Sequence, residues 1–313
     1  NTARIRSSQA AIFSQEEIDN YRNPTDPVKY PSFDWIDHTV KDAVAQNHLL
    51  SLNGGSEKTS FNLSLGYLNQ NGIVGGHDYQ RYNLDLRVDT KVSEVISGGA
   101  IIRLAKKDIV EPPYTDDNFM LTVYASNPTY GPYLSDGSGH LTRGYKPGSP
   151  ANITPDSGQK LGSRTFDNYT VNAQSYINVK IAEGLTWGVK GAVNLDSDFS
   201  KTHAYPVDLY WWSTNSLWAQ FGGLKGVTDR FDQSLLTTLY STLHYERIFG
   251  QDHYFSGLVG YNQESFKNNF LQGNRVEFPD PSLMEINAGS PEGQSTNGTA
   301  YEWAIQSFFG RIN

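Results

Sequence analysis

Residues 82–89 read YNLDLRVD, and this stretch decides the fold because apolar and polar side chains alternate along it. In an extended chain, successive side chains point to opposite sides, so one side carries only apolar groups. That side holds Leu84, Leu86 and Val88, and the opposite side holds Asn83, Asp85, Arg87 and Asp89. The same period of two recurs at residues 61–67, 171–181, 185–195, 235–245 and 254–262. Such a pattern is typical of strands with one apolar face, so the sequence predicts an all-β protein.

The links between the predicted strands alternate in length. Short, turn-like links fall at residues 53–57, 90–94, 182–184 and 249–251, and longer ones at 69–78, 108–163, 200–226 and 270–300. Short turns on one side and long loops on the other are typical of an antiparallel up-and-down barrel that crosses an outer membrane. A secreted, β-rich soluble domain also fits the alternation, and the charge on the polar face does not discriminate between the two. The loop pattern favours the barrel.

Composition excludes several other classes of protein. The 313 residues carry a net charge of −8, contain no cysteine and are 37% hydrophobic, with 13% aromatic residues. No apolar run approaches the roughly 18–20 residues of a membrane-spanning helix. Without cysteine there is neither a disulfide framework nor a thiolate metal site. Lysine and arginine are scattered among acidic residues, so nucleic acid is not an expected partner.

The sequence predicts neither an enzyme nor a cofactor. The seven histidines lack the spacing of a zinc site. Residues 136–139 (DGSG) and 196–198 (DSD) faintly resemble calcium loops, but neither completes the EF-hand pattern. A calcium ion on a loop is therefore an unsupported alternative. The paired acids at 16–17 and 116–117 are more simply explained as solvated surface than as a glycosidase pair.

Aromatic residues on the long loops are the candidate ligand contacts, because such rings stack on sugar faces or hold peptide side chains. The alternative is that they pack the loops together or form an aromatic girdle. The candidates are Tyr130, Tyr133, Trp211, Trp212 and Trp218.

Several motifs resemble one family in order and spacing. Residues 46–59 (QNHLLSLNGGSEKT) resemble the QNHxLSLSGGSEKT segment of the SusC/RagA family, TonB-linked outer-membrane proteins of Bacteroidetes. Residues 64–74 (SLGYLNQNGIV) resemble its SLGYLxQxGIV, and residues 81–85 (RYNLD) its RxNxD. Upstream, residues 33–35 (FDW) look like the family's approach to that strand. At the end, residues 309–313 (FGRIN) resemble FGRVNY at the head of a later strand.

The resemblance implies a fold in which this chain is the middle segment of a 22-stranded transmembrane barrel. We expect about nine strands in a strongly curved antiparallel sheet. In this interpretation residues 1–47 form a loop with a short helix that leads to the first strand, and residues 48–313 form barrel strands and extracellular loops. Ser14 and Glu17 match a capping box, which predicts that helix at about residues 15–21. The family's plug domain and TonB box have no counterpart in this segment.

The resemblance also implies a function, TonB-dependent import of oligosaccharides or peptides across the bacterial outer membrane. Its expected partners are a SusD-like surface lipoprotein, the TonB–ExbB–ExbD complex acting through the plug, the ligand and outer-membrane lipid. Alternatives from other classes are a secreted carbohydrate-binding or hydrolytic domain and a surface adhesin. In the barrel, the polar strand positions would face the lumen, among them Asn83, Asp85, Arg87, Asn172, Gln174 and Asn178.

Overall fold

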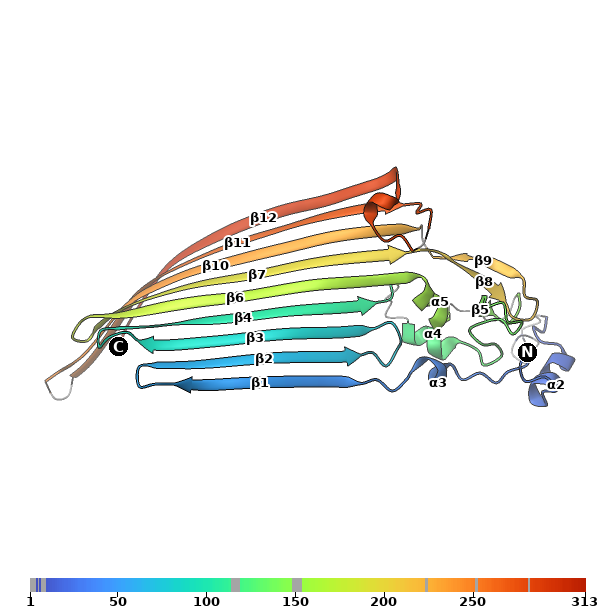
Figure 1. Ribbon diagram of the computed structural model, residues 1–313, viewed down its shortest axis with the longest axis horizontal. Helices are drawn as coiled ribbons and strands as arrows, with labels where there is room; N and C mark the ends of the chain where they lie inside the picture. Colours follow the sequence, from blue (N-terminus) through green and yellow to red (C-terminus); the bar gives the residue numbers. More distant parts are fainter. Residues whose placement is uncertain are drawn as a thin grey trace.

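The computed structural model describes residues 4, 6, 10–113, 119–147, 154–222, 225–250, 253–280 and 282–313. Its main body is one sheet of nine antiparallel strands, each paired with the next of the nine along the chain (Figure 1). In sheet order these are β1 (Ala45–Gly55), β2 (Thr59–Asn71), β3 (Asp78–Lys91), β4 (Ile96–Glu111), β6 (Gly162–Ala182), β7 (Leu185–Ala204), β10 (Gly226–Phe249), β11 (His253–Val276) and β12 (Ser290–Ile312). The predicted curved, all-β sheet is confirmed.

The short and long links lie at opposite ends of this sheet, as the sequence predicts (Figure 1). The strands nevertheless run further than the alternation indicates. The predicted loop at residues 270–300 shrinks to 277–289, and residues 309–312 lie at the end of β12 rather than at the head of a strand. Where both faces of a strand meet water, the side chains no longer alternate between apolar and polar, although the backbone pairing continues. The alternation therefore marks only part of each strand.

The long links and the N-terminal residues fold into what we call the loop module, which comprises the described residues of 10–39, 119–147, 154–161 and 205–222. Its small sheet pairs β5 with β8 in parallel and β8 with β9 in antiparallel. Its elements are α2 (Gln15–Arg22), α3 (Trp35–Thr39), α4 (Phe119–Ala125), β5 (Leu141–Gly144), α5 (Pro155–Lys160), β8 (Val207–Trp211) and β9 (Leu217–Phe221). A short 3-10 helix, η1 (Ile286–Ala288), lies outside the module in the β11–β12 link.

The predicted capping box is present at the start of α2. Ser14 N donates to Glu17 Oε2 at 2.7 Å, and Glu17 N donates to Ser14 Oγ at 3.1 Å. The two bonds satisfy backbone donors that the first turn of a helix leaves free. None of the helices in the described part of the chain is long and apolar enough to cross a membrane.

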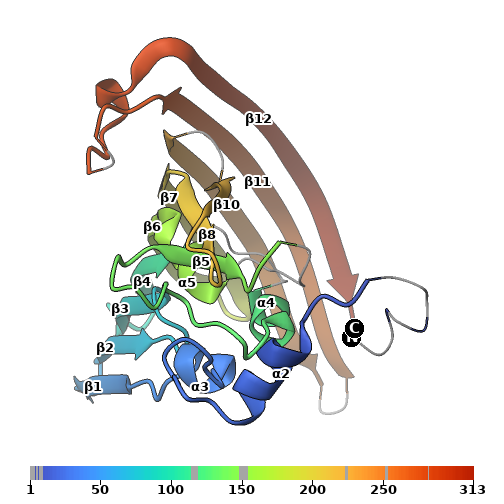
Figure 2. The ribbon, with the colours of Figure 1, turned by 90° about the vertical axis from the view of Figure 1, so that its right-hand side faces the viewer.

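The loop module lies at the long-loop end of the sheet, on its concave side (Figure 2). Glycines fix the points where the chain leaves the wall. Gly162 has φ +132°, and a Cβ there would lie 1.9 Å from the carbonyl oxygen of His203. Gly222 has φ +109°, and its Cβ would meet Leu161. Both conformations disfavour any residue with a side chain, so the module is joined to the wall by close backbone contact.

Candidate functional site

The concave face of the sheet carries the predicted lumen residues. Register partners share a face in an antiparallel sheet, and the pairings join Asp85 to Arg103 and Arg103 to Asn172. Arg103 Nε lies 3.2 Å from Asp85 Oδ1, and Asn172 Nδ2 donates to Asn194 Oδ1. The six residues Asn83, Asp85, Arg87, Asn172, Gln174 and Asn178 all fall on this face. That they contact a ligand stays a prediction.

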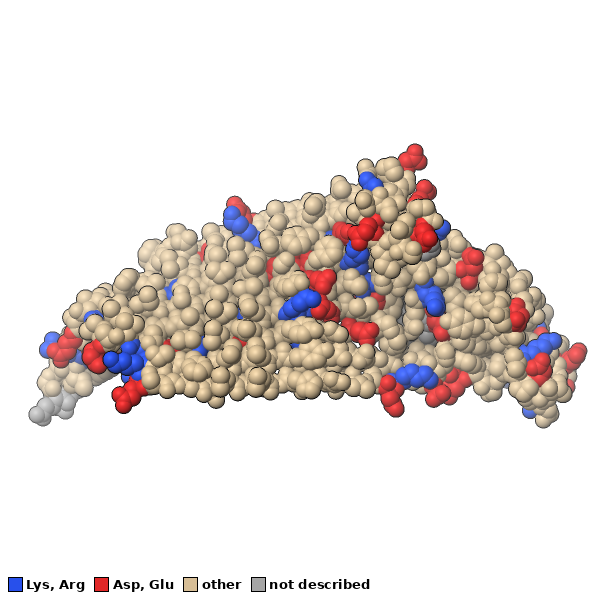
Figure 3. Space-filling model, in the orientation of Figure 1, with Lys and Arg blue, Asp and Glu red and all other residues tan. Residues whose placement is uncertain are grey.

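The convex face carries the opposite set and is apolar. Leu65 is paired with Leu84, and Leu63 with Leu86, and Leu65 is 42% exposed. Leu63, Leu65, Leu84, Leu86, Val88, Val189 and Val193 share this face. Figure 3 shows this side, where charges are sparse between the short-turn end and the middle of the strands and gather toward the long-loop end. In the described ranges no second sheet packs across it, which removes the core that a secreted sandwich requires.

The apolar band on the convex face crosses the sheet obliquely. One row of register partners passes through Leu65 and Leu84 and ends with Lys267 and Glu302. This last pair is an ion pair of 3.1 Å whose side chains are 67% and 70% exposed. Charged groups so exposed do not belong in lipid, whereas leucines at the same register do. The lipid-facing band must run parallel to the bilayer, yet it crosses the rows of register partners at an angle. The strands are therefore tilted relative to the bilayer normal, as barrel closure requires.

The five predicted loop aromatics divide into two groups. Tyr130 is 0% and Trp212 7% exposed, and both belong to the core of the loop module together with Trp35, Val123, Leu134 and Tyr145. Trp212 Nε1 donates to the carbonyl of Lys29 at 2.9 Å, and Trp35 Nε1 to that of Asn127 at 2.8 Å. These rings pack the loops together, which is the alternative that the sequence left open.

The other three aromatics reach the surface of the module. Tyr133 and Trp218 are exposed and Trp211 is half-buried. The Arg143 guanidinium lies 4.7 Å from the centre of the Trp218 ring, a cation–π arrangement that fixes the indole. Burial lowers the pKa of Arg143 from its ordinary value. Ligand contact therefore stays a prediction mainly for Tyr133, Trp211 and Trp218.

The α2 helix is fastened to the module by a partly buried polar cluster. Lys146 Nζ lies 2.6 Å from Glu17 Oε2, and Tyr145 Oη donates to Glu17 Oε1 at 3.2 Å. Burial alone would raise the pKa of Glu17, but hydrogen bonds from Lys146 and Ser14 outweigh it and hold the pKa below its ordinary value of 4.5. Burial and the charge of Glu17 raise the pKa of Tyr145 to about 12, so its hydroxyl stays a donor.

This cluster predicts a loss of α2 docking in acid. Because the folded pKa of Glu17 is depressed, its stabilisation is complete above the ordinary value of 4.5 and is lost as pH falls through the lower, folded pKa. In the full-length protein, limited proteolysis near α2 should stay slow at neutral pH and become faster below about pH 4.5. Glu17→Gln should weaken docking at neutral pH and flatten this pH dependence. An unchanged acid response in that variant would assign it to other groups.

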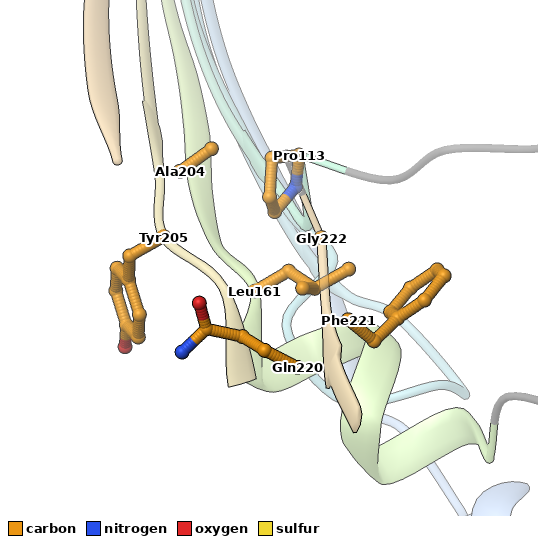
Figure 4. A pocket seen from close by; sticks show the side chains of 7 residues that line it. All are labelled: Pro113, Leu161, Ala204, Tyr205, Gln220, Phe221 and Gly222. Atoms are coloured by element: carbon orange, nitrogen blue, oxygen red, sulfur yellow. The ribbon is translucent and has the colours of Figure 1, made fainter. Parts of the chain in front are cut away.

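A cavity of about 460 Å³ lies where the loop module meets the wall (Figure 4). Its lining is mainly apolar, and the amide of Gln220 is the principal polar side chain, held by a 3.2 Å bond to Asp208 Oδ1. The lining residues are Pro113, Leu161, Ala204, Tyr205, Gln220, Phe221 and Gly222. They come from the ends of β4, β6, β7 and β9. The cavity therefore lies where Gly162 and Gly222 bring the loop module against the wall.

The two calcium-like motifs have other roles. Asp136 accepts hydrogen bonds from Ser138 N and Asn215 Nδ2, both at 2.9 Å, and Asp196 accepts one from Thr170 at 2.8 Å. Over the described ranges, no group of three or more His, Asp or Glu side chains is arranged to hold a metal ion. The absence of a cofactor stays a prediction. The acidic pair at 116–117 lies outside the described residues.

Sequence reasoning missed a group of rings on the concave face of β11 and β12. Phe266 and Trp303 are register partners whose ring centres lie 5.6 Å apart, nearly parallel at 20°. Tyr301 lies on the same face with its ring 5.7 Å from that of Phe266. These residues flank the predicted long loop at 270–300 and lie outside the strand predicted at 254–262. The alternation of rings at 301 and 303 was the available signal.

Comparisons with known proteins agree with this geometry, although no family model matches the chain. TonB-dependent receptor P26 of Formosa agariphila is 25% identical over 299 residues, which cover 93% of this chain and 28% of the receptor. TonB-dependent receptor SusC of Bacteroides thetaiotaomicron is 30% identical over 83 residues, 25% of this chain and 8% of that protein. The chain thus spans about a quarter of the length of the curated relatives that it matches along most of its own length.

Solved structures of the RagAB peptide transporter have the same fold. One superposes with a TM-score of 0.75 at 20% identity, over 96% of this chain and 33% of that one. Its 'closed-closed' state gives 0.74, over 90% and 31%. All these relatives are named as receptors or importers, in line with the expectation of a non-enzymatic chain. In its sequence motifs and in its tilted nine-stranded wall, the chain is thus similar to one segment of these TonB-dependent receptors.

Proposed function

We propose that this chain forms part of the wall and mouth of an outer-membrane importer that takes up oligosaccharides, or peptides, with energy supplied through TonB. The observation that carries the proposal is the two-faced, nine-stranded sheet. Its convex face is apolar and its concave face polar, and all long links gather at one end. A wall of this kind suits lipid outside and a hydrated ligand path inside. The importers among the relatives support it.

A SusD-like lipoprotein is the proposed partner at the long-loop end. The loop module offers a folded surface there, because its own core holds the long links in place. Trp218 and Tyr133 give this surface exposed rings, which are favoured in protein interfaces and in ligand contacts alike. The TonB–ExbB–ExbD complex would act through the plug domain of the complete receptor, on the periplasmic side.

Uptake by living cells tests this function. In the bacterium that encodes the receptor, deletion of its gene should abolish accumulation of the cognate labelled oligosaccharide or peptide. Deletion of tonB, or collapse of the proton gradient, should have the same effect, whereas re-expression of the full-length gene should restore uptake. Screening a panel of neutral and acidic oligosaccharides and of peptides identifies the cargo. Unchanged uptake of every member of the panel in the deletion strain would contradict the proposal.

A further inference from the structure

Three rings on β11 and β12 form a continuous surface on the concave side of the wall, which we call the ring platform: Phe266, Tyr301 and Trp303. The centre of the Phe266 ring lies 5.6 Å from that of Trp303 and 5.7 Å from that of Tyr301. Register places the platform on the face of Asp85 and Asn172, because the row that joins them continues through Asn194 and Leu236 to Phe266. The platform therefore faces the same space as the polar wall.

The reverse side of the same strands fixes the height of the platform. Lys267 follows Phe266, and Glu302 lies between Tyr301 and Trp303, so their side chains point to the convex face. They form the exposed ion pair described above. Because that pair lies outside the lipid-facing band, this portion of β11 and β12 rises beyond the bilayer. The platform thus lines the mouth of the lumen, where cargo first meets the wall.

The chemistry of the platform fits a sugar ring. Tyr301 and Trp303 place two large rings on the concave face of β12, side by side with Phe266. Hydrogen-bonding side chains alternate with the rings on the same face, since Asn268 is paired with Tyr301, and Glu264 with Ile305. A pyranose presents apolar C–H groups on its face and hydroxyls around its edge. Aromatic faces take the former, and amide or carboxylate oxygens and amide hydrogens take the latter.

The charged side chains near the ring platform bear on whether a neutral or an acidic sugar binds there. Glu264 is the ionisable side chain of β11 that shares the face of the platform in the described chain. Arg230 of the neighbouring β10 is already engaged, stacked 4.0 Å from the centre of the Phe270 ring and paired with Asp232. An acidic sugar at the platform would meet the Glu264 carboxylate. The local charge therefore favours a neutral glycan over a uronate or a sulfated one.

We propose that Phe266, Tyr301 and Trp303 form a stacking site for the neutral hexose rings of an oligosaccharide cargo at the mouth of the lumen. This rests on the proposed function and specifies its substrate class. Trp303 supplies the largest ring, and Phe266 packs against it from the neighbouring strand. Asn268 and Glu264 bond the hydroxyls at the rim.

Calorimetric titration of the full-length receptor, purified with its partner lipoprotein, tests the site. The probes are maltohexaose, cellohexaose and mannohexaose as neutral glycans, trigalacturonate as the acidic one and tetra-alanine as the peptide. We expect binding of at least one neutral hexasaccharide, and weakening by about tenfold or more in Trp303→Ala, because one stacking contact is worth roughly 1 kcal/mol or more. Trp303→Phe should retain part of the affinity. Glu302→Gln, next in sequence but on the convex face, is the matched control and should bind as the native protein does.

The outcomes separate this inference from the general function. Heat-modifiable mobility in gels checks that each variant is folded, and Tyr301→Ala repeats the test should Trp303→Ala fail to assemble. Native affinity in the platform variants, or binding of only trigalacturonate or tetra-alanine by the native receptor, overturns the sugar site while leaving an importer in place. No binding of any neutral probe overturns it as well. Only loss of TonB-dependent uptake of every cargo tests the importer itself.

Discussion

Replacing Leu63 by arginine is expected to block assembly of the barrel in the outer membrane. Leu63 lies on the convex face between Leu52 and Leu86, its register partners on β1 and β3. A guanidinium in the lipid-facing band near the bilayer midplane costs about 2–4 kcal/mol. The level of heat-modifiable, protease-resistant receptor in the outer membrane should fall several-fold or more.

The neighbouring residue supplies the matched control. Asn62 is adjacent in sequence but faces the concave side, in the row of Asn53 and Arg87, which already carries a cation. Asn62→Arg should therefore leave the amount of folded receptor nearly unchanged. Equal losses of folded receptor in the two variants would mean that the convex face does not meet lipid. That result would favour the secreted β-sandwich instead.

Replacing Trp212 by alanine is expected to unfold the loop module without unfolding the wall. Its indole fills the module core and holds the carbonyl of Lys29, which ties the N-terminal residues to β8. Truncating a buried tryptophan to alanine typically costs about 3–5 kcal/mol, a large share of what so small a core can supply. Limited proteolysis of the full-length receptor should then cleave within residues 205–222, while heat-modifiable mobility of the barrel persists.

Trp218→Ala is the control for Trp212→Ala, because it removes an exposed tryptophan ring instead of a buried one. This tryptophan is exposed on β9, with Arg143 over its face. Its removal should leave the protease pattern close to native. A native pattern in Trp212→Ala would show that the module has no cooperative core of its own.

Alternation predicted the wall because a membrane protein repeats one simple condition along every strand. The chain meets lipid on one side and water on the other, and residues 82–89 accordingly alternate between apolar and polar at every position. The loop module follows no such repeat. Tyr130 and Trp212 lie in one core although they are separated by β5, β6 and β7 in sequence. Nothing in their local sequence distinguishes a ring that packs loops from a ring that grips a ligand.

The candidate site was predicted in part for the same reason. The six polar positions on the concave face follow from the period of two. The ring platform lies above the lipid band, where neither face must be apolar, so the short alternation of Tyr301 and Trp303 was a weak signal of a strand. Their partner Phe266 sits on another strand, and only register brings it to them.

The interleaving of the module with the wall bears on how quickly the chain can find its fold. Every second link of the large sheet is a short turn, so the pairing of those strands closes small loops at little entropic cost. The gap between β4 and β6 is the longest of the other links, since about 50 residues separate Glu111 from Gly162. A module with its own core gathers much of that length before the strands meet, and brings their ends together at Gly162. The wall can then grow strand by strand, and the slow search for a distant partner becomes a nearly local step.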